Sequence, residues 1–389
     1  MARGRADFDG HALRVLRATR PVDGRLLSAA ALAARVGTSK ARILAYENNH
    51  SVPEPARIAE LARVFRIPPD RLSASDARHL SVRDLRVHAG LTAEQVAVSL
   101  GVSRRTYRDV ESMARLPVRD DGTLRIRLAA CLGVPLGRIN RALHHHPLAI
   151  ARRAQIADHL TALFERAHET RFPAVVPPDD ERLRAVAALV QRVPTVVCRL
   201  VNNELVRYRR LLRGQAMAEL EAAYAEDEHA ARAAKERRRR FTGLVETAPA
   251  RSAEVLSSFL AEAMSARQWR AMVSLVDTGA EGIAVRHPSD ANADVWSALL
   301  ERSFVTRIVH VEQGVHVYVL SARGLNAMRG EFRMYACLYP RIATPLLFRH
   351  LLVATQGRSQ GRSQGRGKRS PRREDRVRKE PQPITTAEG

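Results

Sequence analysis

The sequence Leu27-Ser-Ala-Ala-Ala-Leu-Ala-Ala-Arg-Val-Gly-Thr-Ser39 recurs with changes 64 positions later, as Leu91-Thr-Ala-Glu-Gln-Val-Ala-Val-Ser-Leu-Gly-Val-Ser103. The same offset relates landmarks beyond this stretch, and it becomes 67 after the prolines because the second segment has three more residues near Asp120. This many coincidences do not arise by chance, so we interpret the first 150 residues as two copies of one unit. The paired landmarks are Gly37 and Gly101, Ser39 and Ser103, Glu47 and Glu111, Pro53 and Pro117, and Pro68 and Pro135.

Each copy is predicted to contain two short helices joined by a tight turn. Ser28 and Thr92 are suited to cap the first helix, and Gln95 completes a capping box with Thr92. Apolar residues follow at helical spacing, and a glycine then allows the chain to turn with a positive φ. Two helices joined in this way form a helix-turn-helix unit. The remaining positions are Leu32, Ala33, Val36, Gly37, Ser39, Ile43 and Tyr46 in the first copy, and Val96, Ala97, Leu100, Gly101, Ser103, Tyr107 and Val110 in the second.

The first copy resembles the Xre/Cro-type helix-turn-helix family through its Leu-Ser start at Leu27, its Val36-Gly37 turn, and Tyr46-Glu47-Asn48. The second copy resembles the same family. The resemblance implies a mainly α fold with tandem lambda-repressor-like domains. The residue patterns that follow predict a helical connector, a small α+β winged-helix-like module and a disordered basic tail. The matching ranges are 13–72 and 85–139, and the expected domain bounds are 8–75, 78–145, 151–250, 252–350 and 356–389.

The sequence departs from the family pattern in both copies. Alanine stands where the family often has a glutamine that contacts phosphate, and Asn-Gly after the glutamate is replaced. The first copy also has an insertion, Pro21 to Gly24, between its first two helices. These changes concern the affinity of each copy for DNA rather than its fold. The replaced positions are Ala29 and Ala93, Asn48-Asn49, and Ser112-Met113.

The resemblance also implies which residues contact DNA. In this fold the second helix of the pair lies in the major groove with its N-terminal residues against base edges. Arginine can bind guanine O6 and N7 together, so the second copy is expected to contact bases and the first to contact mostly phosphates. The alternative is that these are solvated charges on a repeat that binds protein. The implied residues are Ser39, Lys40 and Arg42, with Ser103, Arg104, Arg105, Thr106 and Arg108.

Two glutamates have a structural interpretation. Glu47 is expected to pair with Arg17, and Glu111 with Arg86, which ties the first helix of each copy to the DNA-contacting helix. Loss of one partner of a largely buried ion pair costs roughly 3–5 kcal/mol. Neither glutamate is therefore a candidate for chemistry.

The C-terminal half has different patterns. Residues 183–193 and 203–240 are predicted to be helical, the latter as one long helix with Leu205, Tyr208, Leu212, Leu220 and Tyr224 near one face. Helices are also expected at 269–275 and 290–303, before β-branched runs at 305–311 and 315–320 that indicate a hairpin. This order resembles a MarR-type winged helix. Its helix 290–303 is acidic, through Asp290, Asp294 and Glu301, and is expected to mediate dimerisation or contact with a protein partner.

The charge balance favours a polyanionic partner. Lys and Arg total 64 against 41 Asp and Glu, which gives a net charge of +23. A GC-rich genome would explain why only four of the basic residues are lysine, but it would not explain the positive excess. Double-stranded DNA is therefore the expected partner. We expect the run Arg237, Arg238, Arg239 and Arg240, and the tail at 358–379, to contact phosphates without sequence preference. The Gly-, Ser- and Gln-rich tail is expected to be disordered.

Several classes of protein are disfavoured. No apolar run is long enough for a transmembrane helix, and no secretion signal is evident, so no membrane association is expected. The dispersed Cys131, Cys198 and Cys337 suit a reducing cytoplasm, and we expect a cytoplasmic, nucleoid-associated protein. Three adjacent histidines, His144 to His146, cannot all face one ion on a helix, so they are expected to be a helix-end cluster like the carboxylates of 179–181. No metal, cofactor or enzymatic motif is predicted.

The sequence therefore predicts a sequence-specific double-stranded DNA-binding transcriptional regulator. Maintenance of a plasmid, a phage or a chromosome end, through replication or partition, is the first alternative. The second is a protein-interaction scaffold whose helix-turn-helix units no longer bind DNA. An enzyme is the least supported class.

Overall fold

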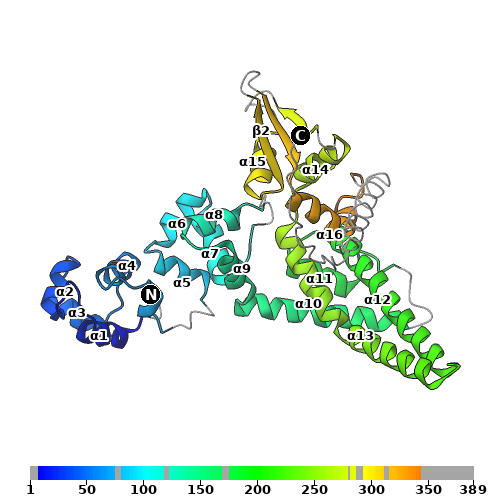
Figure 1. Ribbon diagram of the computed structural model, residues 1–389, viewed down its shortest axis with the longest axis horizontal. Coiled ribbons are helices and arrows are strands. Elements are labelled where there is room, and N and C mark those ends of the chain that lie inside the picture. The colour runs from blue at the N-terminus through cyan, green and yellow to red at the C-terminus, as the bar shows by residue number, and fades with distance from the viewer. Residues whose placement is uncertain are drawn as a thin grey trace, which may run out of the picture. The chain divides into compact units, whose positions relative to one another are not determined.

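The computed structural model describes residues 8–74, 80–117, 122–168, 175–278, 281–285, 292–310 and 315–342 (Figure 1). The described chain is mainly helical with one small sheet, as the sequence predicts. The expected disordered tail, residues 356–389, lies outside the described residues. Among the described helices, none is by itself long and apolar enough to cross a membrane. The helices Glu181–Val190 and Pro194–Ala223 reach the required length and apolar character only as a pair, and a bend of 107° separates them.

Residues 8–74 form a group of short helices around one core. Asp9, Ser28 and Ser39 each cap a helix by accepting a hydrogen bond from a backbone N–H in its first turn. Leu13, Leu32 and other large apolar side chains are fully buried between the helices. The elements are α1 (Gly10–Thr19), α2 (Ala29–Arg35), α3 (Lys40–Glu47), α4 (Pro55–Val64) and the 3-10 helix η1 (Pro69–Leu72).

Residues 80–144 form a second group with a core of its own. Val96, Tyr107, Leu128 and Ile139 are at most 1% exposed and belong to a second apolar cluster. Val87 of α5 packs in the first cluster instead, so the two groups are in contact. Capping boxes at Ser81 and Thr92 fix the starts of its first two helices. The elements are α5 (Val82–His88), α6 (Ala93–Leu100), α7 (Arg104–Met113), α8 (Leu124–Cys131) and α9 (Leu136–His144).

The connector contains a long helical hairpin, so the prediction of one helix over residues 203–240 is wrong. The chain reverses after Tyr224, and Asp227 caps the next helix through Ala230 N at 2.7 Å. The missing Cβ of Gly214 leaves room for the Phe241 ring, so the two helices pack closely side by side. The elements are α10 (Pro147–Glu165), η2 (Arg166–His168), α11 (Glu181–Val190), α12 (Pro194–Ala223) and α13 (Glu228–Glu262).

The expected apolar face of this region is also only partly correct. Leu205 and Tyr208 are buried, but Leu220 is 53% exposed and Tyr224 is 82% exposed. The hairpin explains the difference, because Leu220 and Tyr224 lie near its turn, at the end of α12 (Figure 1). The helix α13 runs without a break from Glu228 to Glu262 and includes Pro249. The expected domain boundary near residue 251 therefore falls within a continuous helix.

The last described group contains a three-stranded antiparallel sheet in the order β1-β3-β2. The predicted hairpin is confirmed for its described residues, with Val305 opposite Leu320 and His310 opposite Val315. Between β1 and β2 the described residues form one helix, α15, so the helix pair of a winged helix-turn-helix is not seen there. The elements are α14 (Ala266–Thr278), β1 (Ile283–Val285), α15 (Ala293–Glu301), β2 (Val305–His310), β3 (Val315–Leu320) and α16 (Ala322–Leu338).

Aromatic stacking holds this last group together. The Trp269 ring of α14 stacks on Tyr335 of α16 with ring centroids 4.2 Å apart. Trp296 of α15 stacks on Tyr318 of β3 at 4.9 Å. Because these are the two tryptophans of the chain, their fluorescence reports on this group alone.

Two glycines of α16 are expected to respond oppositely to substitution by alanine. A Cβ on Gly324 would collide with the carbonyl oxygen of Phe304, whereas a Cβ on Gly330 meets no described atom within 4 Å. Gly324→Ala should therefore lower the free energy of unfolding by about 1–3 kcal/mol, and Gly330→Ala should raise it by about 0.5–1 kcal/mol through helix propensity. Urea unfolding followed by tryptophan fluorescence measures both, and equal effects would contradict the described contact between α16 and Phe304.

Candidate DNA interface

The helices α2 and α3 form a helix-turn-helix pair. Ser28 Oγ accepts a hydrogen bond from Ala31 N at 3.1 Å, which fixes the start of α2. The chain turns at Gly37, whose φ of +61° is the left-handed conformation that glycine adopts without strain. Ser39 Oγ then accepts from Arg42 N at 3.2 Å and starts α3. The predicted caps and turn are thus confirmed in this copy.

The N-terminal turn of α3 is exposed and positively charged. Lys40 and Arg42 are exposed, while Ile43 and Tyr46 on the opposite face are buried in the core. Arg42 Nε also donates to the Tyr46 hydroxyl at 3.3 Å, which orients the guanidinium along the helix. Ser39 is exposed, but its hydroxyl is engaged in the cap. Two cations on the exposed first turn of a helix fit a polyanion such as DNA.

A bidentate ion pair fixes α3 to α1. Arg17 Nε and Nη2 donate to the two carboxylate oxygens of Glu47 at 2.6 and 2.9 Å, and Nη1 donates to the Leu27 carbonyl at 3.3 Å. The Glu47 side chain is only 2% exposed, and its hydrogen bond raises the pKa of Arg17. The prediction that Glu47 has this structural role is confirmed.

A second contact between α1 and the end of α3 escaped sequence reasoning. Gly10 N donates to Asn49 Oδ1 at 2.9 Å, and a Cβ on Gly10 would collide with the Tyr46 carbonyl oxygen. Asn49 itself has a φ of +56°, a conformation that asparagine adopts more readily than most residues. Asn48-Asn49 therefore supplies the turn that glycine supplies in the family pattern. Gly10, which follows the Asp9 cap, was the sequence feature that could have indicated this close contact.

The helices α6 and α7 repeat this local arrangement. Thr92 and Gln95 form the predicted reciprocal capping box, and Gly101 turns the chain with a φ of +65°. Ser103 Oγ accepts from Thr106 N at 3.0 Å, and the two hydroxyls lie 2.8 Å apart. Ser103 and Thr106 are therefore bonded to each other at the start of α7. These caps and the turn agree with the sequence prediction.

The exposed face of α7 is more basic than that of α3. Arg104, Arg105 and Arg108 are all exposed. Arg104 forms an ion pair with Glu94 of α6 at 3.1 Å, which caps and apolar spacing do not predict. Both side chains of that pair are more than half exposed, and such surface pairs contribute about 0–1 kcal/mol. Arg104 therefore remains available to another anion.

The ion pair that anchors α7 has the same three contacts as that of α3. Arg86 Nε and Nη2 donate to the Glu111 carboxylate at 2.9 and 2.8 Å, and Nη1 donates to the Leu91 carbonyl at 2.9 Å. Burial works to lower the pKa of Arg86, but the hydrogen bond and charge of Glu111 outweigh it and raise that pKa. Burial raises the pKa of the adjacent Tyr107, and the charge of Glu111 adds to the shift. The predicted Arg86–Glu111 pair is confirmed.

The arginine run Arg237, Arg238, Arg239 and Arg240 lies in the middle of α13, not at a helix end as the sequence suggested. Arg237 pairs with Glu221 at 2.5 Å, and Arg238 pairs with Glu219 at 3.3 Å. All four side chains are about half exposed, so these surface pairs are weak. Arg239 and Arg240 are exposed, and no carboxylate in the described part of the chain pairs with them. Arg239 and Arg240 are therefore the two arginines of the run that can contact phosphates without first breaking an ion pair.

The histidine cluster lies where two helices meet, as the sequence predicts. His144 ends α9, His145 follows it, and His146 caps α10 through a hydrogen bond from Leu148 N at 3.2 Å. Asp180 likewise caps α11 in the predicted carboxylate cluster. Within the described ranges, no group of three or more histidine, cysteine or acidic side chains is placed to hold a metal ion.

Comparison with known families supports the first helix pair directly. Residues 24–72 match the family model HTH_3, a helix-turn-helix. Comparison with curated proteins and with solved structures finds no match. The matched segment contains α2, α3 and α4, so the chain contains a helix-turn-helix domain of a DNA-binding family.

Removal of either anchoring glutamate is expected to destabilise its own group of helices more than the other group. Glu47→Ala and Glu111→Ala each leave a largely buried guanidinium without its carboxylate, which costs roughly 3–5 kcal/mol. Hydrogen exchange with peptide-level mass spectrometry should show faster exchange in residues 8–74 for the first variant and in 80–144 for the second.

Glu60→Ala is the matched control, because Glu60 forms a half-exposed pair with Arg57 within α4. Its effect should stay within about 0.5 kcal/mol. An effect of Glu47→Ala no larger than this would show that the buried pair does not hold α3.

Proposed function

We propose that the protein is a sequence-specific double-stranded DNA-binding transcriptional regulator. The observation on which this rests is the α2–α3 pair, which matches a helix-turn-helix family and exposes Lys40 and Arg42 on the first turn of α3. In such a domain this turn lies against base edges in the major groove. The positive excess of the whole chain supports the same partner.

We further propose that α6 and α7 are a second DNA-binding helix-turn-helix. This proposal is supported by the same caps, the same positive-φ glycine, and the same contacts of an arginine with a glutamate and a leucine carbonyl. Arg104, Arg105 and Arg108 then contact bases, since a guanidinium binds guanine O6 and N7 together. Lys40 and Arg42 contribute mainly phosphate contacts.

Two DNA-binding units in one chain would bind neighbouring half-sites. Once one unit is bound, linkage raises the effective concentration of the other, which compensates for weak binding by each alone. The target is then longer than the site of a single domain and need not be palindromic. Arg239 and Arg240 would add affinity without sequence preference.

Selection from random duplex DNA at about 0.15 M salt tests the proposal. The full chain should select a motif that contains guanines. Arg105→Ala/Arg108→Ala should relax the motif at those guanines, because each bidentate arginine–guanine pair contributes about 1–3 kcal/mol of discrimination. Lys40→Ala/Arg42→Ala should instead weaken binding to all sequences and reduce the log-log salt slope by roughly 0.9 for each phosphate that is no longer neutralised.

The charge-matched control is Arg182→Ala/Arg184→Ala, on the exposed face of α11. It should leave both the motif and the affinity unchanged. Binding without any motif, equally weakened by the control, would contradict sequence-specific regulation and leave charge as the only source of affinity. Genomic positions of a selected motif at promoters support regulation, whereas repeated copies at a replicon end or origin support the maintenance alternative.

A further inference from the structure

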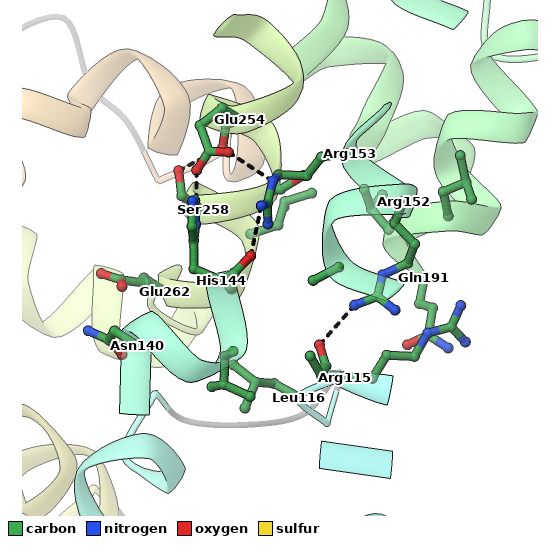
Figure 2. Close-up of a pocket in the computed structure, with 18 of the residues that line it drawn as sticks. Arg115, Leu116, Asn140, His144, Arg152, Arg153, Gln191, Glu254, Ser258 and Glu262 are labelled. Carbon is green, nitrogen blue, oxygen red and sulfur yellow. Dashed lines mark hydrogen bonds and ion pairs between the residues drawn. The ribbon is translucent and has the colours of Figure 1, made fainter. Parts of the chain in front are cut away.

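A cavity of about 470 Å³ lies beside the end of α7. Its walls come from five segments: the residues that follow α7, the start of α8, the α9–α10 junction, the end of α11, and the last turns of α13 (Figure 2). This volume is in the range of sites that hold small organic ligands.

The walls of the cavity have an excess of positive charge. Six arginines line it against two glutamates, and both glutamates are already paired. Glu262 accepts from Arg125 at 2.6 Å, and Glu254 lies 3.0 Å from Arg153 and 3.5 Å from His144. Figure 2 shows Arg153 between Glu254 and the His144 carbonyl, to which it donates at 2.7 Å.

Arg115 and Arg152 are two cations of the lining that these glutamates do not pair with. Arg152 donates to the backbone carbonyls of Met113 and Ala114 at 2.7 and 2.9 Å, which supply no negative charge to balance it. Burial lowers the pKa of Arg152, and the charges of Arg115 and Arg153 lower it further. Arg115 Nε is buried and has no hydrogen-bond partner in the described part of the chain. Like charges held together in this way favour the binding of an anion.

The lining also has apolar side chains. Leu116, Leu189 and Val190 line the cavity and are half-buried, so each still has apolar surface to present to it. An inorganic ion would leave this surface uncovered, whereas a ligand with an apolar body would remove it from water. The lining therefore suits a molecule with one anionic end and one apolar end.

We infer that this cavity binds a small organic anion, with its carboxylate, phosphate or sulfonate group between Arg115 and Arg152 and its apolar part on Leu116, Leu189 and Val190. The ligand also influences α7, because Arg152 holds the carbonyls of Met113 and Ala114 where that helix ends. An anion that attracts Arg152 competes with these carbonyls. This second part rests on the proposed DNA binding by α7, whereas the binding site itself does not.

The test uses the full chain and 8-anilinonaphthalene-1-sulfonate, a fluorescent probe with one sulfonate and an apolar body. The variant Arg115→Gln/Arg141→Gln removes two lining charges that have no carboxylate partner among the described residues, so the fold should be retained. Its dissociation constant for the probe should rise at least tenfold, while the charge-matched Arg182→Gln/Arg184→Gln keeps the value of the unchanged chain. The uncharged analogue N-phenyl-1-naphthylamine should bind at least tenfold more weakly than the sulfonate.

Three results would overturn the site: equal probe affinity in the lining variant, equal affinity for the uncharged analogue, or displacement of the probe by a short duplex of arbitrary sequence. The last result would make the cavity a contact with the DNA backbone. Influence on α7 is measured separately, by titrating the selected duplex with and without the probe. If the probe changes the dissociation constant for the duplex threefold or more in the unchanged chain, but not in the lining variant, the influence on α7 is supported. Probe binding without this shift overturns the influence on α7 alone, and failure to select any duplex removes the proposed function but not the site.

Discussion

The geometry of each exposed basic helix depends on one arginine–glutamate pair. Arg17 and Arg86 come from the first helix of their groups, and each uses all three guanidinium nitrogens to hold a glutamate at the end of the following helix pair and a carbonyl before that pair. The planar fork of arginine makes this a fixed geometry that a lysine could not reproduce. A short helix has too little apolar surface to fix its own rotation, and this pair supplies the missing constraint.

Much of this was predictable from the sequence, because the signals are local. Ser39 and Ser103 cap helices through the next turn, and Gly37 and Gly101 reverse the chain within a few residues. The two ion pairs were also predictable, since the family resemblance supplied the partners. The β2–β3 hairpin was predictable because its β-branched runs are a local signal. Each feature is determined by residues close in sequence or by a known pattern.

The features that the sequence did not reveal depend on residues far apart in the chain. The break before Asp227 is weak as a local signal, and α12 and α13 become a hairpin because contacts such as Gly214 with Phe241 stabilise the reversal. Glu94 was not expected to meet Arg104, and nothing near Arg152 indicates that it reaches the end of α7. The composition gives the number of arginines, but it does not reveal which of them form ion pairs with carboxylates in the folded chain.

The proline inside α13 affects how that helix resists bending. Thirty-five residues of α-helix measure about 52 Å, so small tilts at one end become displacements of several ångströms at the other. Pro249 has no N–H to bond the carbonyl of Val245, and its ring crowds that carbonyl. Bending of the helix therefore costs least at this residue, which lies between the hairpin turn at one end and Glu254 and Glu262 at the other. The position of Pro249 in the sequence thus determines where along α13 the helix resists bending least.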